Sequence, residues 1–369
     1  MAQAWRPEQH FRRNLAAVAC WEVVWGFGAA CVSTSIVMAF LTQLTGSKAL
    51  IGSLSLTNLL GLPALFVTVY VNRRLRRKRP FTAVLWAVQV LNWVVLGVGV
   101  CLSGGSALAP LVALVFLVHA AIHVANGLAV APTYELLANV FGRRWGTAQG
   151  VQLFSNRVLG MAGGLFAASV LDRYPFPTNF GLIFLVGGIL LTLSNASLLA
   201  MVEPPTYGGA DPPPFGTYLR GLATTVAGHR EFVTFTLVIG LLAFIAMAQG
   251  FYVVYALETL SLGPAYAGIF TTIAFGANGI GGLVAGPVGD RLGHRRLLLG
   301  ALGLHLASLL AVLAMRDLWE FYVALALSGI ATVAASIATA NLTADFAPGR
   351  GEGRVHGCDS AGRPSGDCA

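Results

Sequence analysis

Long apolar runs separated by short polar segments dominate this chain. A helix that crosses a bilayer needs about 20 predominantly apolar residues, and ten runs are long enough. They are too long and too continuous to be the alternating strands of a membrane barrel. The pattern therefore predicts ten membrane helices, at residues 15–44, 49–71, 81–104, 107–137, 147–171, 178–202, 231–257, 264–288, 295–315 and 318–341.

Composition agrees with a membrane location. Hydrophobic residues make up 56% of the 369 residues and charged residues only 10%, which is more apolar surface than a soluble chain can bury. The net charge of +8 raises the alternative of a nucleic-acid partner. However, the basic residues lie in short loops and form no basic face with interleaved aromatic residues. We expect the lipid bilayer, and no nucleic acid, as the partner.

The basic residues also predict the orientation. Most of them precede the first run or follow an even-numbered run, and the opposite loops hold only Lys48, Arg173 and Arg316. Cytoplasmic loops carry the excess of Lys and Arg in membrane proteins. We therefore expect a multi-pass protein of the inner or plasma membrane with a cytoplasmic N-terminus.

The chain repeats part of its own pattern. The segment 290–296, Asp-Arg-Leu-Gly-His-Arg-Arg, follows the eighth run much as the segment 72–78, Asn-Arg-Arg-Leu-Arg-Arg-Lys, follows the second. Internal duplication of this kind is typical of transporters. We expect a six-helix bundle over 1–202, a cytoplasmic Pro-rich linker over 203–230, an incomplete four-helix bundle over 231–345, and a polar tail over 346–369 that is too short and polar to span a membrane.

The segment 286–295, Gly-Pro-Val-Gly-Asp-Arg-Leu-Gly-His-Arg, resembles the Gly-x3-Asp-Arg-x-Gly-x-Arg loop of the major facilitator superfamily. In the first half the motif is degraded, with Thr68, Asn72 and Leu75 at the first glycine, the aspartate and the second glycine. The resemblance implies an all-α fold of two bundles, alternating access, a monomer, and no cofactor beyond a proton gradient. It also implies a cytoplasmic gating role for Asn72, Arg73, Arg76, Arg77, Gly286, Asp290, Arg291, Gly293 and Arg295.

The number of helices departs from the family pattern. The resemblance implies six helices in each half, and this chain shows six and four. Two interpretations stay open: a frameshift or premature stop near Arg354, or a genuine ten-helix protein. We favour the first interpretation, because the repeat and the family pattern both require more helix.

Polar side chains at membrane depth are costly, so they face a cavity or a partner. Arg157 lies ~15 Å into its helix at 1.5 Å per residue, and Glu22 ~10 Å into the first. We predict a Glu22–Arg157 pair that is either purely structural or the proton-coupling site. Trp21 and Trp25 flank Glu22 and offer an aromatic wall for an organic substrate.

Two other groups of polar residues are candidates for the same cavity. His119, His123 and Asn126 share one helix face and either bind substrate or join helices by hydrogen bonds. Two histidines without further ligands do not make a metal site. In the second half Gln249 and Tyr252 are placed on one face of their helix. Small polar residues usually serve helix packing, which is the alternative role for both.

We find no nucleophile–base constellation and no phosphate-binding glycine loop, so we expect no enzyme. The sequence favours secondary active transport of a small organic solute, with proton-coupled efflux as the leading form. The alternatives are uptake of an anionic nutrient, which Arg157 favours, and a non-transporting remnant or sensor.

Overall fold

The computed structural model describes residues 7–72, 74–75, 77–104, 108–204, 213–228 and 230–345, and it is helical throughout its long elements. The first half comprises α1 (Pro7–Cys31), α2 (Thr34–Leu44), α3 (Lys48–Ser53), a 3-10 helix η1 (Leu54–Leu60), α4 (Gly61–Asn72), α5 (Arg79–Ser103), α6 (Leu108–Phe141), a short 3-10 turn η2 (Gly142–Arg144), α7 (Trp145–Arg173) and α8 (Thr178–Leu199). The second half comprises α10 (Arg230–Thr259), α11 (Ala265–Leu292), α12 (His294–Ala314) and α13 (Leu318–Asp345), and α9 (Phe215–Gly228) lies between the halves in sequence.

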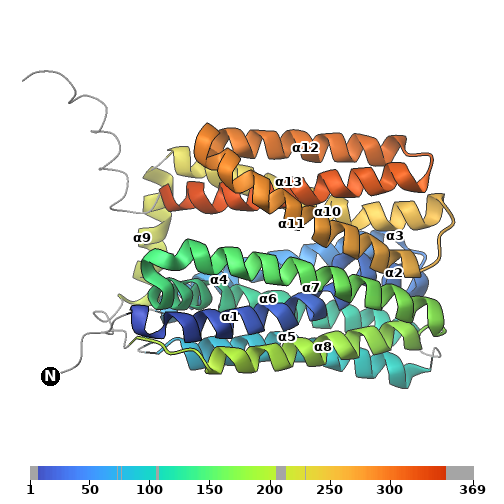
Figure 1. Cartoon of the computed structure of the whole chain (residues 1–369), viewed down its shortest axis with the longest axis horizontal. Helices are drawn as coiled ribbons and strands as arrows, with labels where there is room; N and C mark the ends of the chain where they lie inside the picture. The colour runs from blue at the N-terminus through green and yellow to red at the C-terminus, as the bar shows by residue number, and fades with distance from the viewer. Residues whose placement is uncertain are drawn as a thin grey trace, which may run out of the picture.

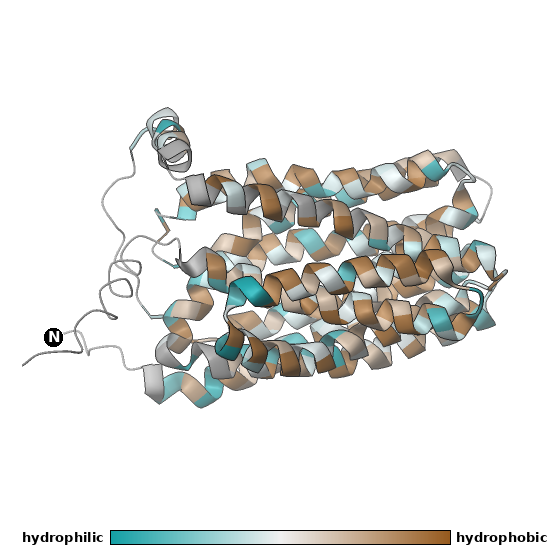
Figure 2. Ribbon diagram, turned by 90° about the horizontal axis from the view of Figure 1, so that it is seen from above, coloured by the Kyte–Doolittle hydropathy of each residue, from teal (hydrophilic) through white to brown (hydrophobic). Residues whose placement is uncertain are grey.

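The long helices run side by side, and α9 lies across them at the end where the chain begins (Figure 1). Nine helical stretches of the described residues are long and apolar enough to cross a membrane. The 30-residue α10 is a tenth long helix. Figure 2 shows apolar residues along most of the length of the bundle. The ten predicted helices are thus all present as helical segments.

Two predicted helices are interrupted. The run 15–44 breaks at Ser33, whose backbone is extended (φ −63°, ψ 156°), so that α1 and α2 are separate helices. The run 49–71 contains the 3-10 segment η1 between α3 and α4. The predicted linker also contains a helix, α9, with Phe215, Tyr218 and Leu219 at helical spacing. Hydropathy sums over a window, so it does not resolve such local changes of helix type.

The bundle has two distinct ends, which we name by their residues. Arg12, Arg79, Arg144 and Arg295 lie at or near helix termini at the arginine-rich end, and Lys48, Arg173, Glu258 and Arg316 lie at the far end. At the arginine-rich end the first half is held together by polar contacts. Arg79 donates to the carbonyl oxygens of Leu199 (3.1 Å) and Met201 (2.5 Å).

The core extends across both halves. Phe40, Phe180 and Phe184 of the first half and Phe270 and Phe321 of the second are fully buried in one cluster. The halves pack mainly through α7 and α11. Gly164 and Gly268 allow this approach, because a Cβ on either would overlap the backbone of the opposite helix.

Candidate transport site

Glu22 lies between α1 and α7 and is held by two amides. Asn156 Nδ2 donates to Oε2 (2.9 Å), and Gln152 Nε2 donates to Oε1 (3.3 Å). Gln152 and Asn156 are one turn apart on α7, so both reach the same neighbour. Gly26, one turn after Glu22, faces the backbone of Asn156, and any Cβ there would overlap it. The glycine therefore brings α7 close enough for its amides to hold the carboxylate.

Arg157 does not form the predicted ion pair with Glu22. Among the described residues it makes no salt bridge within 4.0 Å, although the two charges interact electrostatically. Its guanidinium instead lies over the ring of Phe275 on α11, with Cζ 5.3 Å from the ring centroid. Gly279 leaves room for the Arg157 stem. Adjacent helix residues point in different directions, so Asn156 faces Glu22 while Arg157 faces the second half.

The Arg157 charge is left incompletely satisfied. Its Nε atom is buried and has no hydrogen-bond partner in the described part of the chain. A buried donor nitrogen without a hydrogen bond is costly, and planar guanidinium groups bind carboxylate and phosphate through two parallel hydrogen bonds. Arg157 is therefore suited to receive an anionic group at the junction of the two halves.

The tryptophans form a cluster in which they pack against one another. The Trp21 and Trp86 rings lie 6.0 Å apart, and the Trp25 and Trp86 rings lie 4.9 Å apart, both edge to face. Trp86 donates to the hydroxyl of Thr133 (2.9 Å). Trp21 is only 4% exposed, within a core cluster of α1, α6 and α8. Trp21 is thus packed within this cluster, whereas Trp25 and Trp86 are half-buried, and the aromatic wall remains a prediction.

His119 and His123 lie on α6 with their ring centroids 6.0 Å apart. His119 also meets Trp93 edge to face at 5.2 Å, and its Nδ1 is buried without a hydrogen-bond partner in the described chain. Asn126 is half-buried further along the same helix. No group of three or more potential metal ligands occurs among the described residues.

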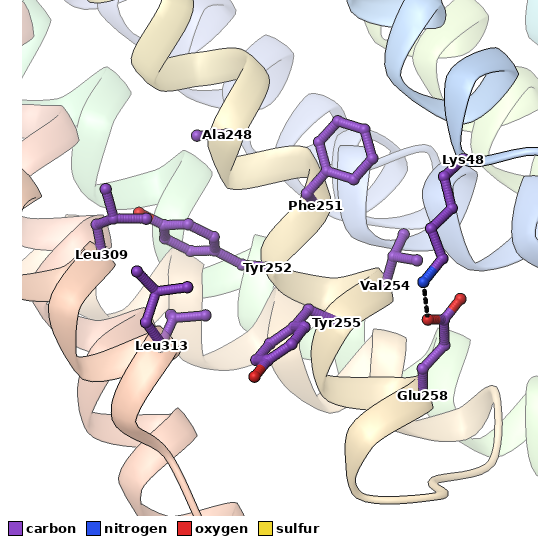
Figure 3. A pocket seen from close by; sticks show the side chains of 10 residues that line it. Lys48, Ala248, Phe251, Tyr252, Val254, Tyr255, Glu258, Leu309 and Leu313 are labelled. Atoms are coloured by element: carbon purple, nitrogen blue, oxygen red, sulfur yellow. Dashed lines mark hydrogen bonds and ion pairs between the residues drawn. The ribbon is translucent and has the colours of Figure 1, made fainter.

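Gln249 and Tyr252 face different neighbours, although the sequence placed them on one helix face. Gln249 Nε2 donates to Ser328 Oγ (2.6 Å) and Thr332 Oγ1 (3.0 Å), which joins α10 to α13. Tyr252 is 5% exposed and points toward Leu309 of α12 (Figure 3). Gln249 thus serves as an interhelical link, which is the packing role considered for it.

The chain is similar to known proteins both in sequence and in structure. A sequence model described as Major Facilitator Superfamily matches residues 235–366. No curated protein gives a significant match. The second half of the chain is thus similar to the Major Facilitator Superfamily.

Solved transporters share a fold with this chain. The xylose transporter XylE from E. coli, in a partially occluded inward open conformation, aligns over 90% of this chain and 86% of its own, with 13% identity and a TM-score of 0.57. A bacterial homologue of the human lysosomal transporter Spinster, inward-facing and occupied, aligns over 95% and 77%, with 15% identity and a TM-score of 0.60. A D-xylose–proton symporter aligns over 91% and 90%, with 16% identity and a TM-score of 0.51.

The similarity of residues 235–366 to this superfamily favours a secondary transporter over an enzyme. Such a transporter works by alternating access, in which one bundle rocks against the other around a site between them. Glu22 and Arg157 lie beside the α7–α11 junction. Relative movement of the two bundles would therefore change the surroundings of both side chains.

The superfamily motif makes contacts within each half. In the first half Asn72 donates to Glu135 of α6, and Glu135 also pairs with the buried Lys78. Burial lowers the pKa of Lys78, an effect that the Glu203 carboxylate opposes. Glu203 accepts from the backbone N–H groups of Lys78 (2.7 Å) and Arg79 (3.1 Å). These bonds fix the loop between α4 and α5.

The remaining motif residues have structural explanations or lie outside the description. Gly293 has φ +88°, which suits the turn from α11 into α12. Asp290 is 80% exposed on its side chain and lies 4.0 Å from His294. Arg77, Arg291 and Arg295 are exposed, and the Gly286 position faces open space. Arg73 and Arg76 fall outside the described residues. The predicted gating role remains a prediction, since these contacts do not join the halves.

Contacts between the halves lie at mid-span and at the far end. Ser33 and Thr271 share a hydrogen bond of 2.7 Å, and Thr272 Oγ1 donates to the Met161 carbonyl oxygen (3.2 Å). At the far end Lys48 of α3 pairs with Glu258 of α10 at 2.8 Å (Figure 3). This ion pair borders a pocket of about 320 Å³ between α10 and α12.

Proposed function

We propose that this chain couples proton binding at Glu22 to the transport of a small organic solute by alternating access. The observation that supports this most is that neutral amides hold Glu22 between α1 and α7, with no cation within 4.0 Å among the described residues. An ionised carboxylate there is costly, so taking up a proton is its natural response. Side-chain amides offer both donors and acceptors, so Gln152 and Asn156 can serve the charged and the neutral carboxyl group.

Proton binding at Glu22 would reach the second half through Arg157. While Glu22 is ionised, its charge partly balances that of Arg157. When Glu22 is neutral, the guanidinium is less well compensated at the junction with α11, where Phe275 lies against it. The electrostatic balance between the halves therefore changes with the protonation of one carboxyl group.

We propose an inner or plasma membrane location with the arginine-rich end in the cytoplasm, following the distribution of basic residues. In that orientation the contacts between the halves at mid-span and at the far end favour an inward-facing state. Two of the similar solved structures, the xylose transporter and the Spinster homologue, are in inward conformations.

Efflux is the direction we propose first, with Trp25 and Trp86 as the aromatic surface for an organic solute. A second candidate is uptake of an organic anion, which the unsatisfied Arg157 Nε favours. The two differ in coupling. An efflux substrate exchanges with the proton, whereas an anion that binds Arg157 when Glu22 is neutral travels with it.

The test uses the full chain in proteoliposomes with an imposed pH gradient and two probes, ethidium as an organic cation and radiolabelled benzoate as an organic anion. Proton-driven ethidium exchange supports efflux, and proton-driven benzoate accumulation supports uptake. Either movement should lose its dependence on the gradient in Glu22→Gln. Gradient-driven transport that is unchanged in Glu22→Gln would overturn the proposed role of Glu22.

A further inference from the structure

An apolar groove of about 350 Å³ runs between α11 and α12, with α13 at its base. Val284 and Val288 line it from α11, Gly300 and Leu304 from α12, and Ile330 from α13. All five lie in helical stretches that are long and apolar enough to span the membrane. The groove therefore lies beside the hydrocarbon of the bilayer and not beside water.

The groove is open because its walls carry small residues. A Cβ placed on Gly300 meets nothing within 4 Å, so the space in front of this residue is empty. The surrounding surface is apolar and exposed, as Val284 (58%) and Leu299 (62%) show. An apolar groove of a few hundred cubic ångströms is large enough for an apolar ligand.

One charged side chain lines this groove, and it lies at the arginine-rich end. Arg296 is exposed, and among the described residues it makes no hydrogen bond or ion pair. Its neighbours Arg291 and Arg295 are also exposed, and the nearby Asp290 lies beside His294. The groove thus combines an apolar channel with an unpaired guanidinium at the level where lipid headgroups lie.

We infer that this groove binds an anionic phospholipid, with an acyl chain between α11 and α12 and the phosphate on Arg296. The occupant follows from charge and place: hydrocarbon is the phase beside the groove, and guanidinium groups bind phosphate. A zwitterionic lipid would fill the groove with its chain but would gain less at Arg296. The inference does not depend on the proposed transport function.

The test measures lipid binding to the purified full chain in detergent by native mass spectrometry and by thermal unfolding. We expect phosphatidylglycerol to bind and to raise the midpoint of unfolding by a few degrees, because a ligand of the folded state stabilises it. Phosphatidylcholine should bind at least about tenfold more weakly, which is ~1.4 kcal/mol. Inorganic phosphate alone should not shift the midpoint, which separates a lipid site from a site for free phosphate.

Two variants with matched controls locate the site. Arg296→Gln should weaken phosphatidylglycerol binding about tenfold, whereas Arg295→Gln, one residue away and outside the groove, should not. Gly300→Leu fills the groove without a clash and should also remove the effect. Gly303→Leu is its control, because Gly303 lies on the same helix, faces open space and does not line the groove.

Three results would overturn the inference. Equal binding of phosphatidylcholine and phosphatidylglycerol would remove the role of Arg296. An equal loss in Arg295→Gln would indicate a diffuse basic surface, and full binding by a folded Gly300→Leu protein would place the lipid elsewhere. If Gly300→Leu fails to fold, the comparison of Arg296→Gln with Arg295→Gln still tests the inference.

Discussion

The helices α1 and α10 begin the two halves of one repeated pattern, yet they are packed very differently. Within the first half, α1 packs along α7 and α8. Among the described elements α10 packs more against α2 of the opposite half than against any helix of its own. Three side chains of α10 border the pocket in Figure 3, namely Phe251, Tyr252 and Tyr255.

The polar residues of the two helices differ in the same way. Glu22 of α1 is held between two helices by amides, whereas Gln249 of α10 is a neutral residue that joins α10 to α13. The mid-span charges, Glu22 and Arg157, both belong to the first half. The proposed proton site therefore lies in the first half, and the proposed response of the second half would pass through the α7–α11 junction.

The largest expected effect comes from comparing a crowded glycine of α1, Gly26, with an open glycine of α10, Gly240. Gly26→Leu should displace α7 from α1 and destabilise the protein by about 3 kcal/mol or more, as overpacked interfaces do. Gly240→Leu should be tolerated, because a Cβ there meets nothing within 4 Å. Thermal unfolding in detergent, with recovery from size-exclusion chromatography, measures both. Equal losses would show that α1 is no better packed than α10.

Removing an amide from Glu22 should have the next largest effect. Asn156→Leu takes one of two hydrogen bonds from the carboxylate, and a bond to a charged group contributes about 1.5–3 kcal/mol. Asn92→Leu is the control, since Asn92 bonds only the carbonyl of Val88 in its own helix. The same unfolding measurement applies. A smaller loss for Asn156→Leu than for the control would argue against the Glu22 site.

The equivalent substitution in the second half, Gln249→Leu, should lower the free energy of unfolding by less than Asn156→Leu does. Gln249→Leu removes neutral hydrogen bonds to Ser328 and Thr332, and such interhelical bonds contribute about 0.6 kcal/mol on average in a membrane bundle. The unfolding midpoint of Gln249→Leu should therefore lie between those of wild type and Asn156→Leu. A midpoint below that of Asn156→Leu would reverse the order of the two halves.

The smallest effect is expected at the far end. Lys48 and Glu258 are exposed on their side chains by 70% and 41%, so their pair should contribute ~0.5 kcal/mol. A double-mutant cycle of Lys48→Met and Glu258→Gln isolates this coupling from the individual losses. Coupling well above 1 kcal/mol would mean that this pair holds the halves together more than the buried contacts do.

The fold could be predicted largely from the sequence because lipid requires long apolar helices. Each predicted run is helical in the described part of the chain, and the division into two bundles remains a prediction. The break at Ser33 and the 3-10 segment η1 were not predicted, because both occur inside continuous apolar runs. Residues 346–369, where the sequence suggested an aberrant tail, lie outside the described part of the chain.

The site was predicted less completely. Glu22 and Arg157 were found because charge is rare at membrane depth, but their pairing depends on helix rotation, which one sequence does not fix. Gln152 and Asn156 were missed, although two amides one turn apart on an apolar helix are a usable signal. Phe275 carried no signal, since an aromatic residue on an apolar helix is ordinary.

Infrared spectroscopy of purified protein across a pH titration tests proton binding at Glu22. We expect a band of a protonated carboxyl group in an apolar environment that disappears as the pH rises. This band should be missing from Glu22→Gln and unchanged in Glu258→Gln, whose carboxylate is exposed beside Lys48. A titrating band that persists in Glu22→Gln would contradict proton binding at Glu22, because the proton would then bind to another group.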